Sequence, residues 1–343
     1  MTGAETWEEK INDYTDTIYA MVGFANFYRY DDDAKKMRDE VAIMQGWRFT
    51  PVKPPNDGEP PDDLTPDLAV MCTEEAGLVA EVKKSFPMDR SRWADDFKQL
   101  MSYDADLDGW PNAGGRVARH DVVLLVHLTR SRAVTDYYLA ERDAERVAFS
   151  RPFAVVEFGW SGERQDYFFF RRFHGSLSDQ QVDARLHDGV PVPMMALLGP
   201  YSMVKLYDGE PPLPYFLHII WQEVLSPMAI AKVSPKRIRR KQKVEIEISL
   251  DDLTRELRDK FSFKVLFGDD HPRQPKIPCR EWVKRACDKL VSADLAEWLE
   301  LGNGRKLKVF FQRFEDVLAT FKEVCGRPSG IKQKTLFDEG LEG

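Results

Sequence analysis

The chain has 343 residues, 43% hydrophobic and 31% charged, with a net charge of −8. This composition is typical of a soluble globular protein with one large core or two moderate ones, and it argues against a simple basic nucleic-acid coat. No apolar run approaches the roughly 20 residues that cross a membrane, and the first ten residues, MTGAETWEEK, lack the basic and apolar regions of a secretory signal.

The start of the chain predicts two helices, a strand and a loop. Apolar residues recur at helical spacing within 1–30 and again over roughly 33–45, and the second of these helices carries Glu40. Residues 46–49 predict a first strand. The stretch 51–66 predicts a loop, because it has prolines at 51, 54, 55, 60 and 61 before it ends at Pro66.

Residues 66–83 predict a β-hairpin, because two short apolar runs flank an acidic turn. Alternate side chains of a strand point the same way, so Glu81 and Lys83 share one face. A turn centred near Glu75 places Asp67 opposite Lys83, with Glu81 diagonal to Asp67. Two carboxylates and one ammonium group then gather at one strand end, whereas a register slip of one residue would separate them.

The middle of the chain predicts a helix and three strands around a second, charged helix. The first helix spans about 90–103 and carries Gln99 and Tyr103 on one face, four residues apart. The following elements are a strand buried on both faces, a charged helix and a hairpin, at 120–128, about 131–147, and 153–160 with 165–173. This order describes a mixed α/β domain with a central sheet, in which the aromatic run of the last strand is either core or an interface.

A segment rich in Gly and Pro, at about 176–215, predicts a domain boundary, which we place between 1–200 and 201–343. Beyond it, helices are predicted over 216–230, 250–261, two within 279–300, and 308–325. The C-terminal region is therefore expected to be mainly helical. Its helix pair is open to two interpretations, a helix-turn-helix or ordinary core.

One segment of the C-terminal region is strongly basic. Residues 232–243 hold seven basic residues and no acid. This charge predicts a site for nucleic-acid phosphates or for a partner, although a solvated loop has the same composition. The predicted nucleic-acid-binding residues are Lys236, Arg237, Arg239, Arg240, Lys241 and Lys243.

Several other kinds of site are not indicated. The four cysteines form no CxxC pair, which predicts reduced thiols in a cytoplasmic protein rather than disulfides or a zinc site. The six histidines show no ligand spacing. The chain also lacks a Gly-rich phosphate loop and a GxSxG elbow, which argues against an NTPase or an α/β-hydrolase.

Three short motifs together resemble those of the PD-(D/E)xK nuclease superfamily. They are PD at 66–67, EVK at 81–83 and QLMSY at 99–103, the last similar to the QxxxY motif of exonuclease and recombination-type branches. The resemblance covers about residues 30–130. It implies a restriction-endonuclease-like fold, in which a mixed central sheet is flanked by helices.

The paired carboxylates predict a metal site. Asp67 and Glu81 supply hard oxygen ligands that can hold one or two Mg²⁺ ions, while phosphate and water complete the coordination shell. By the resemblance, the backbone carbonyl of Val82 is a further ligand, Glu40 is an additional upstream ligand, and Mn²⁺ substitutes for Mg²⁺.

The remaining motif residues have predicted roles around this metal site. Lys83 would orient or deprotonate the attacking water, or stabilise the developing negative charge. Gln99 and Tyr103 would contact the site or the nucleic-acid backbone. In a purely structural interpretation, Asp67 is a turn residue, Glu81 and Lys83 form a solvated strand face, and the helical pair lies on the surface.

The sequence thus predicts a Mg²⁺-dependent nuclease that acts on DNA more than on RNA, in phage defence, a mobile element or DNA repair. The preference for DNA follows from the resemblance to DNA-processing branches. One alternative is a non-catalytic nucleic-acid-binding or assembly protein on the same scaffold. Another is a nuclease subunit that requires a protein partner or a second copy of itself.

Overall fold

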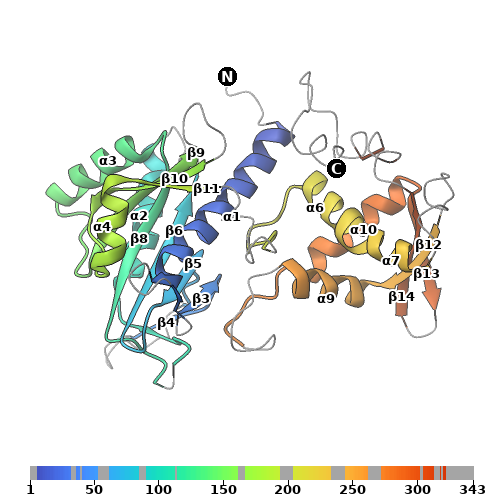
Figure 1. Ribbon diagram of the computed structural model, residues 1–343, viewed down its shortest axis with the longest axis horizontal. Helices are drawn as coiled ribbons and strands as arrows, with labels where there is room; N and C mark the ends of the chain where they lie inside the picture. The colour runs from blue at the N-terminus through green and yellow to red at the C-terminus, as the bar shows by residue number, and fades with distance from the viewer. Residues whose placement is uncertain are drawn as a thin grey trace. The chain divides into compact units, whose positions relative to one another are not determined.

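The computed structural model describes residues 6–31, 36–38, 41–52, 62–84, 90–112, 114–160, 167–193, 204–232, 244–261, 272–301, 304–312, 317 and 320–321. The chain divides into two compact units, whose elements are labelled in Figure 1. The sheet unit comprises Thr15–Asp208 and Phe263–Pro275. The C-terminal unit comprises Gly209–Ser262 and Lys276–Gly343, together with Met1–Tyr14.

The sheet unit is built on a seven-stranded mixed sheet. Its spatial order is β11 (Val190–Pro193), β10 (Tyr167–Gly175), β9 (Phe153–Trp160), β8 (Arg119–His127), β6 (Ala76–Lys83), β5 (Leu68–Met71) and β3 (Ala42–Gln45). Strands β6, β8 and β9 run parallel, and the remaining neighbours pair antiparallel. Two small pairs accompany the sheet, β1 (Tyr30–Asp31) with β2 (Lys36–Met37) and β4 (Thr50–Pro51) with β7 (Leu107–Asp108).

The central strands match the sequence predictions closely. Residues 120–126 of β8 are buried, as expected for a strand with parallel neighbours on both sides and helices over both faces. The hairpin at 66–83 and the hairpin of β9 and β10 are also confirmed. The protein is therefore a mixed α/β protein whose large mixed sheet is flanked by helices.

One face of the sheet is covered by α2 (Trp93–Ser102), which follows the short helix η1 (Arg90–Arg92), and by α3 (Ser131–Asp143). Trp93, Phe97 and Tyr138 of these helices pack in one core with Leu124 and Val155 of the sheet. Both helices were predicted.

The other face carries the Thr15–Arg29 part of α1 (Trp7–Arg29) together with α4 (Gln180–Asp188). Phe27 of α1 packs edge-on against Phe170 of β10, with ring centroids 5.4 Å apart. Asp16 of α1 is buried and accepts hydrogen bonds from Lys84 Nζ (2.5 Å) and Trp160 Nε1 (3.0 Å). These bonds attach α1 to the ends of β6 and β9.

The predicted helix over 33–45 is wrong where the structure describes it. Residues 42–45 form β3, which pairs with β5 and buries Ala42 and Met44 in the core. The predicted strand at 46–49 is also displaced, because β3 ends before Gly46, whose φ is +55°. The periodicity of a short apolar run does not by itself distinguish a strand from a helix. Residues 42–45 are a strand because they pair with β5.

The C-terminal unit contains a three-stranded antiparallel sheet in the order β12 (Val244–Ser249), β14 (Gly304–Phe311) and β13 (Ala296–Leu301). Its helices are α6 (Leu213–Ile219), the π-helical η2 (Ile220–Leu225), α7 (Ser226–Lys232), α9 (Leu250–Phe261) and α10 (Arg280–Ser292). The predictions at 216–230 and 250–261 and the first helix of 279–300 are confirmed.

The prediction of a mainly helical C-terminal region is wrong in two places. The second predicted helix within 279–300 is replaced by β13, which removes the helix-turn-helix, and the start of the predicted helix at 308–325 belongs to β14. In β14, Leu307, Val309 and Phe311 are buried with a period of two, which is typical of a strand with one covered face. No helix in the described segments has the length and apolar character needed to cross a membrane.

Candidate active site

The hairpin of β5 and β6 has a register different from the predicted one. Leu68 lies opposite Ala80, and Met71 lies opposite Gly77. Continuing this pairing by one residue places Asp67 across from Glu81 rather than from Lys83. The predicted pairing is therefore shifted by two residues, an even number, so the predicted face of the sheet is retained.

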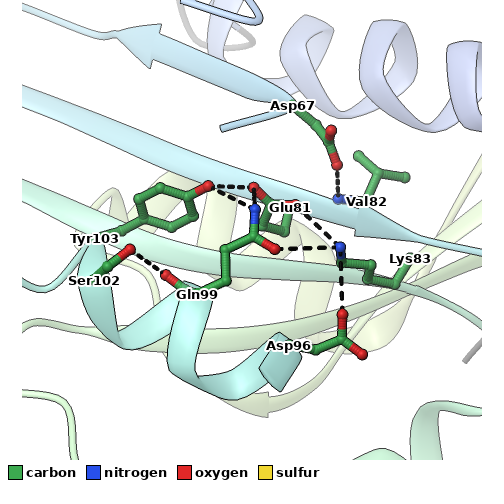
Figure 2. A network of polar contacts seen from close by, with 8 residues as sticks. All are labelled: Asp67, Glu81, Val82, Lys83, Asp96, Gln99, Ser102 and Tyr103. Carbon is green, nitrogen blue, oxygen red and sulfur yellow. Dashed lines mark hydrogen bonds and ion pairs between the residues drawn. The ribbon is translucent and has the colours of Figure 1, made fainter. Parts of the chain in front are cut away.

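Asp67 lies just before β5 and is fixed by the neighbouring strand. Its Oδ2 accepts a hydrogen bond from the backbone N–H of Val82 at 2.7 Å. Figure 2 shows this contact beside the Glu81 and Lys83 side chains. The first carboxylate is thus held at the end of the hairpin where the second carboxylate and the lysine emerge.

Glu81 is buried in the site, with 2% of its surface exposed. Its Oε1 accepts hydrogen bonds from Gln99 Nε2 at 2.9 Å and from the Tyr103 hydroxyl. Its Oε2 lies 3.5 Å from Lys83 Nζ (Figure 2). Gln99, which is exposed, and Tyr103, which is buried, therefore both contact the carboxylate itself.

Helix α2 supplies these donors because of how it packs. Trp93, Phe97 and Leu100 are buried against the sheet, and the adjoining side of the helix then faces β6. The end of the helix is fixed at Tyr103, whose carbonyl oxygen lies 2.8 Å from His120 Nε2. Burial lowers the pKa of His120 to about 4, so the neutral imidazole serves as the donor.

Asp96 is a site residue that the motifs did not identify. Its Oδ1 lies 3.4 Å from Lys83 Nζ, which is also 3.5 Å from Gln99 Oε1 (Figure 2). Asp96, Gln99 and Tyr103 are spaced i, i+3 and i+7, so they share one helix face. Extending the QxxxY spacing one turn towards the start of the helix would have found it.

The site concentrates negative charge in a poorly solvated place. Desolvation raises the pKa of Asp67 and, together with repulsion from Asp67, raises that of Glu81 well above its usual range. Desolvation would lower the pKa of Lys83, but attraction to Glu81, Asp67 and Asp96 outweighs it and raises that pKa. Lys83 is therefore an ammonium ion, and the two carboxylates favour a further proton or cation.

This donor set fits a divalent cation that retains part of its water shell. Mg²⁺ in phosphoryl-transfer sites is commonly bound by one or two carboxylates, with waters and substrate phosphates as the other ligands. Asp67 and Glu81 supply two such carboxylates. The N–H of Val82 is already hydrogen-bonded to Asp67, so the backbone group of Val82 that could bind a metal is its carbonyl oxygen. Across the described segments there is no group of three or more His, Cys, Asp or Glu side chains suited to a metal.

Some predicted site residues lie outside the described residues. They are Glu40 and the basic residues Lys236, Arg237, Arg239, Arg240, Lys241 and Lys243. Their roles remain predictions. The three described cysteines, Cys72, Cys279 and Cys287, form no disulfide.

Comparison with protein-family models, curated proteins and solved structures found no match to the chain. A function for this site therefore depends on its own chemistry. Two desolvated carboxylates, a protonated lysine and a carboxylate-binding amide and phenol meet at one strand end. Such a group can bind a divalent cation and stabilise an anion beside it.

Proposed function

We propose that the protein is a Mg²⁺-dependent nuclease of the PD-(D/E)xK type, with a restriction-endonuclease-like sheet unit. One observation carries the proposal: Asp67, Glu81 and Lys83 meet on one face of the hairpin, and Gln99 and Tyr103 bind Glu81. The mixed sheet flanked by helices supports it further.

In this proposal, Asp67 and Glu81 hold the cation, and Gln99 and Tyr103 fix the orientation of Glu81. The bound cation would lower the pKa of a water ligand and neutralise charge on the phosphate. The water oxygen bonds to phosphorus and gives up a proton to solvent, while the bond to the leaving oxygen breaks and that oxygen takes up a proton. One product then carries a phosphate group, the other a hydroxyl.

Lys83 is assigned to charge stabilisation. In the metal-free chain, attraction to Glu81, Asp67 and Asp96 raises its pKa, and we assign it the role of an ammonium ion rather than of a base. Its ammonium group, 3.5 Å from Glu81, is placed to contact a phosphate oxygen that becomes more negative during the reaction. This selects one of the roles predicted for the lysine.

DNA is the proposed substrate, in preference to RNA, because the QxxxY motif is similar to that of DNA-processing branches. Phage defence, a mobile element and DNA repair are all compatible with such an activity. A nuclease subunit that requires a partner would be silent as the purified chain alone and would cleave only when the partner is added.

Cleavage of linear, circular and single-stranded DNA, and of RNA, by the purified chain in Mg²⁺, Mn²⁺ or EDTA tests the proposal. We expect cleavage with either metal, none in EDTA, and a loss of about a hundredfold or more in Asp67→Asn or Glu81→Gln. Glu75→Gln is the matched control, since it removes an exposed carboxylate from the turn of the same hairpin. Metal-independent binding without cleavage would favour a non-catalytic nucleic-acid-binding protein instead.

A further inference from the structure

A row of side chains extends from the candidate active site across the sheet. Lys83 pairs with Val126, Val126 with Glu157, and Glu157 with Arg171, on four adjacent strands. Residues directly opposite each other point to the same face, so all four side chains lie on the face covered by α2 and α3. Three strand spacings of about 4.8 Å place Lys83 and Arg171 about 14 Å apart along the row.

Arg171 at the end of this row is held in a fixed orientation. The carboxylate of Glu157, which is 4% exposed, accepts bonds from Arg171 Nε at 2.7 Å and from Ser131 Oγ at 2.5 Å. The guanidinium carbon also lies 5.9 Å from the Phe169 ring and 6.0 Å from the Phe173 ring. Because 46% of the Arg171 side chain remains exposed, its other N–H groups are available to a ligand.

Two more arginines lie next to this row, on either side of Ser131, whose Oγ donates a hydrogen bond to Glu157. Arg130 and Arg132 flank Ser131 at the start of α3, directly after β8. Arg132 is exposed and Arg130 half-buried, and neither forms an ion pair within the part of the chain that the structure describes. Asp136, four residues after Arg132 on α3, forms no ion pair with it among the described residues.

We infer that Arg130, Arg132 and Arg171 form a phosphate-binding strip for the nucleic-acid backbone next to the cleaved bond. Because this role presupposes that the neighbouring site cleaves nucleic acid, it rests on the proposed function. Arginine suits the task, since its planar guanidinium donates two parallel hydrogen bonds to a phosphate and remains charged. In a chain with a net charge of −8, these three guanidinium groups, two of them on exposed residues, offer a local attraction for a polyanion.

The size of the strip sets the length of substrate that it contacts. About 14 Å corresponds to roughly four nucleotides along one strand at 3.4 Å per nucleotide. A substrate shorter than this would reach Lys83 but not Arg171. The strip therefore distinguishes a polynucleotide from a single phosphodiester.

Binding of a fluorescent DNA duplex in EDTA, measured by anisotropy over a range of salt concentrations, tests the strip. We expect Arg130→Ala combined with Arg132→Ala to weaken binding by about an order of magnitude and to reduce the salt slope by about 1.8, or 0.9 per lost contact. Arg171→Ala, combined with Glu157→Gln so that no buried charge is left unpaired, should weaken binding in the same direction.

Arg142→Ala combined with Arg146→Ala is the matched control, because it removes an exposed arginine at the other end of α3 and another just after the helix. If the Arg130→Ala and Arg132→Ala variant binds DNA as tightly as wild type, or if the control loses the same affinity, the proposed phosphate-binding strip is wrong. Hydrolysis of bis(p-nitrophenyl) phosphate by the wild-type chain separately tests the chemistry. No hydrolysis of this small diester or of DNA would reject the proposed nuclease, whereas hydrolysis without the binding difference would reject the strip alone.

Discussion

At the scale of single residues, Glu81 shows the conflict between stability and the proposed chemistry. A buried carboxylate beside a second carboxylate is costly unless a cation accompanies it. The hydrogen bonds from Gln99 and Tyr103 and the ammonium group of Lys83 offset this cost only in part, since the pKa of Glu81 remains well above its usual range. Destabilising groups of this kind are typical of functional sites.

The raised pKa of Glu81 predicts how stability changes with pH in the absence of metal. The folded protein binds the proton more tightly than the unfolded chain, so this group lowers the free energy of unfolding as pH rises above its unfolded value of about 4.3. Glu81→Gln removes the effect. We expect this variant to exceed wild type in melting temperature at neutral and alkaline pH, with the difference shrinking towards acidic pH.

Thermal unfolding in EDTA over this pH range measures the difference. Glu75→Gln, in the exposed turn, should follow wild type throughout. A Glu81→Gln variant that is less stable than wild type by the same amount at every pH would contradict the assigned cost.

Asp96 is predicted to position Lys83. Asp96→Asn removes one of three carboxylates that raise the pKa of Lys83, so the ammonium group loses its proton at a lower pH. We expect the alkaline limb of the pH–rate profile for DNA cleavage to move to lower pH and the rate to fall by about tenfold. Asp95→Asn, which removes an exposed neighbouring carboxylate of the same helix, should leave the profile in place.

At the scale of elements, the hairpin and α2 together determine the site. The register of β5 and β6 brings Asp67 level with Glu81, and the buried side of α2 directs its adjoining face to β6. The site end of the hairpin is tied to α1 through Lys84 and Asp16. The other end packs against Trp110, since a Cβ atom on Gly77 would lie 2.5 Å from this ring.

Gly77→Ala is therefore expected to destabilise the protein. The added methyl group has no room beside the buried Trp110, and overpacking of this kind typically costs about 1–3 kcal/mol. Chemical denaturation of Gly77→Ala and of Gly114→Ala, where the added atom meets nothing within 4 Å, measures the effect. Equal stability of the two variants would show that the hairpin can shift away from Trp110.

Much of the sheet unit and its site could be predicted from the sequence because the signals are local. A continuous apolar run indicates the buried β8, and residues 66–83 contain both strands and the turn of their hairpin. The motif spacing placed Gln99 and Tyr103 near Glu81. The motif spacing did not predict which residues of β5 and β6 lie opposite each other, because registers that differ by two residues put the same side chains on the same face.

At the scale of the whole molecule, predictions failed where tertiary pairing decides the structure. Residues 42–45 are a strand because β5 pairs with them, and β14 is a strand because β12 and β13 flank it. Their apolar residues fit a helical stripe as well as a strand when no partner is known. Asp96 was missed for another reason, since a helix face contains more positions than the motif names.

Single-turnover cleavage of duplex DNA at saturating Mg²⁺, by wild type and Lys83→Met, tests the central claim most directly. Methionine retains the apolar stem of the lysine without its charge, and in saturating Mg²⁺ we expect the variant to fold with both carboxylates in place. We predict metal-dependent cleavage by wild type, and a cleavage rate in the variant that is reduced by about a hundredfold or more. Cleavage by Lys83→Met at the wild-type rate, or no metal-dependent cleavage by wild type, would contradict a nuclease site built on Asp67, Glu81 and Lys83.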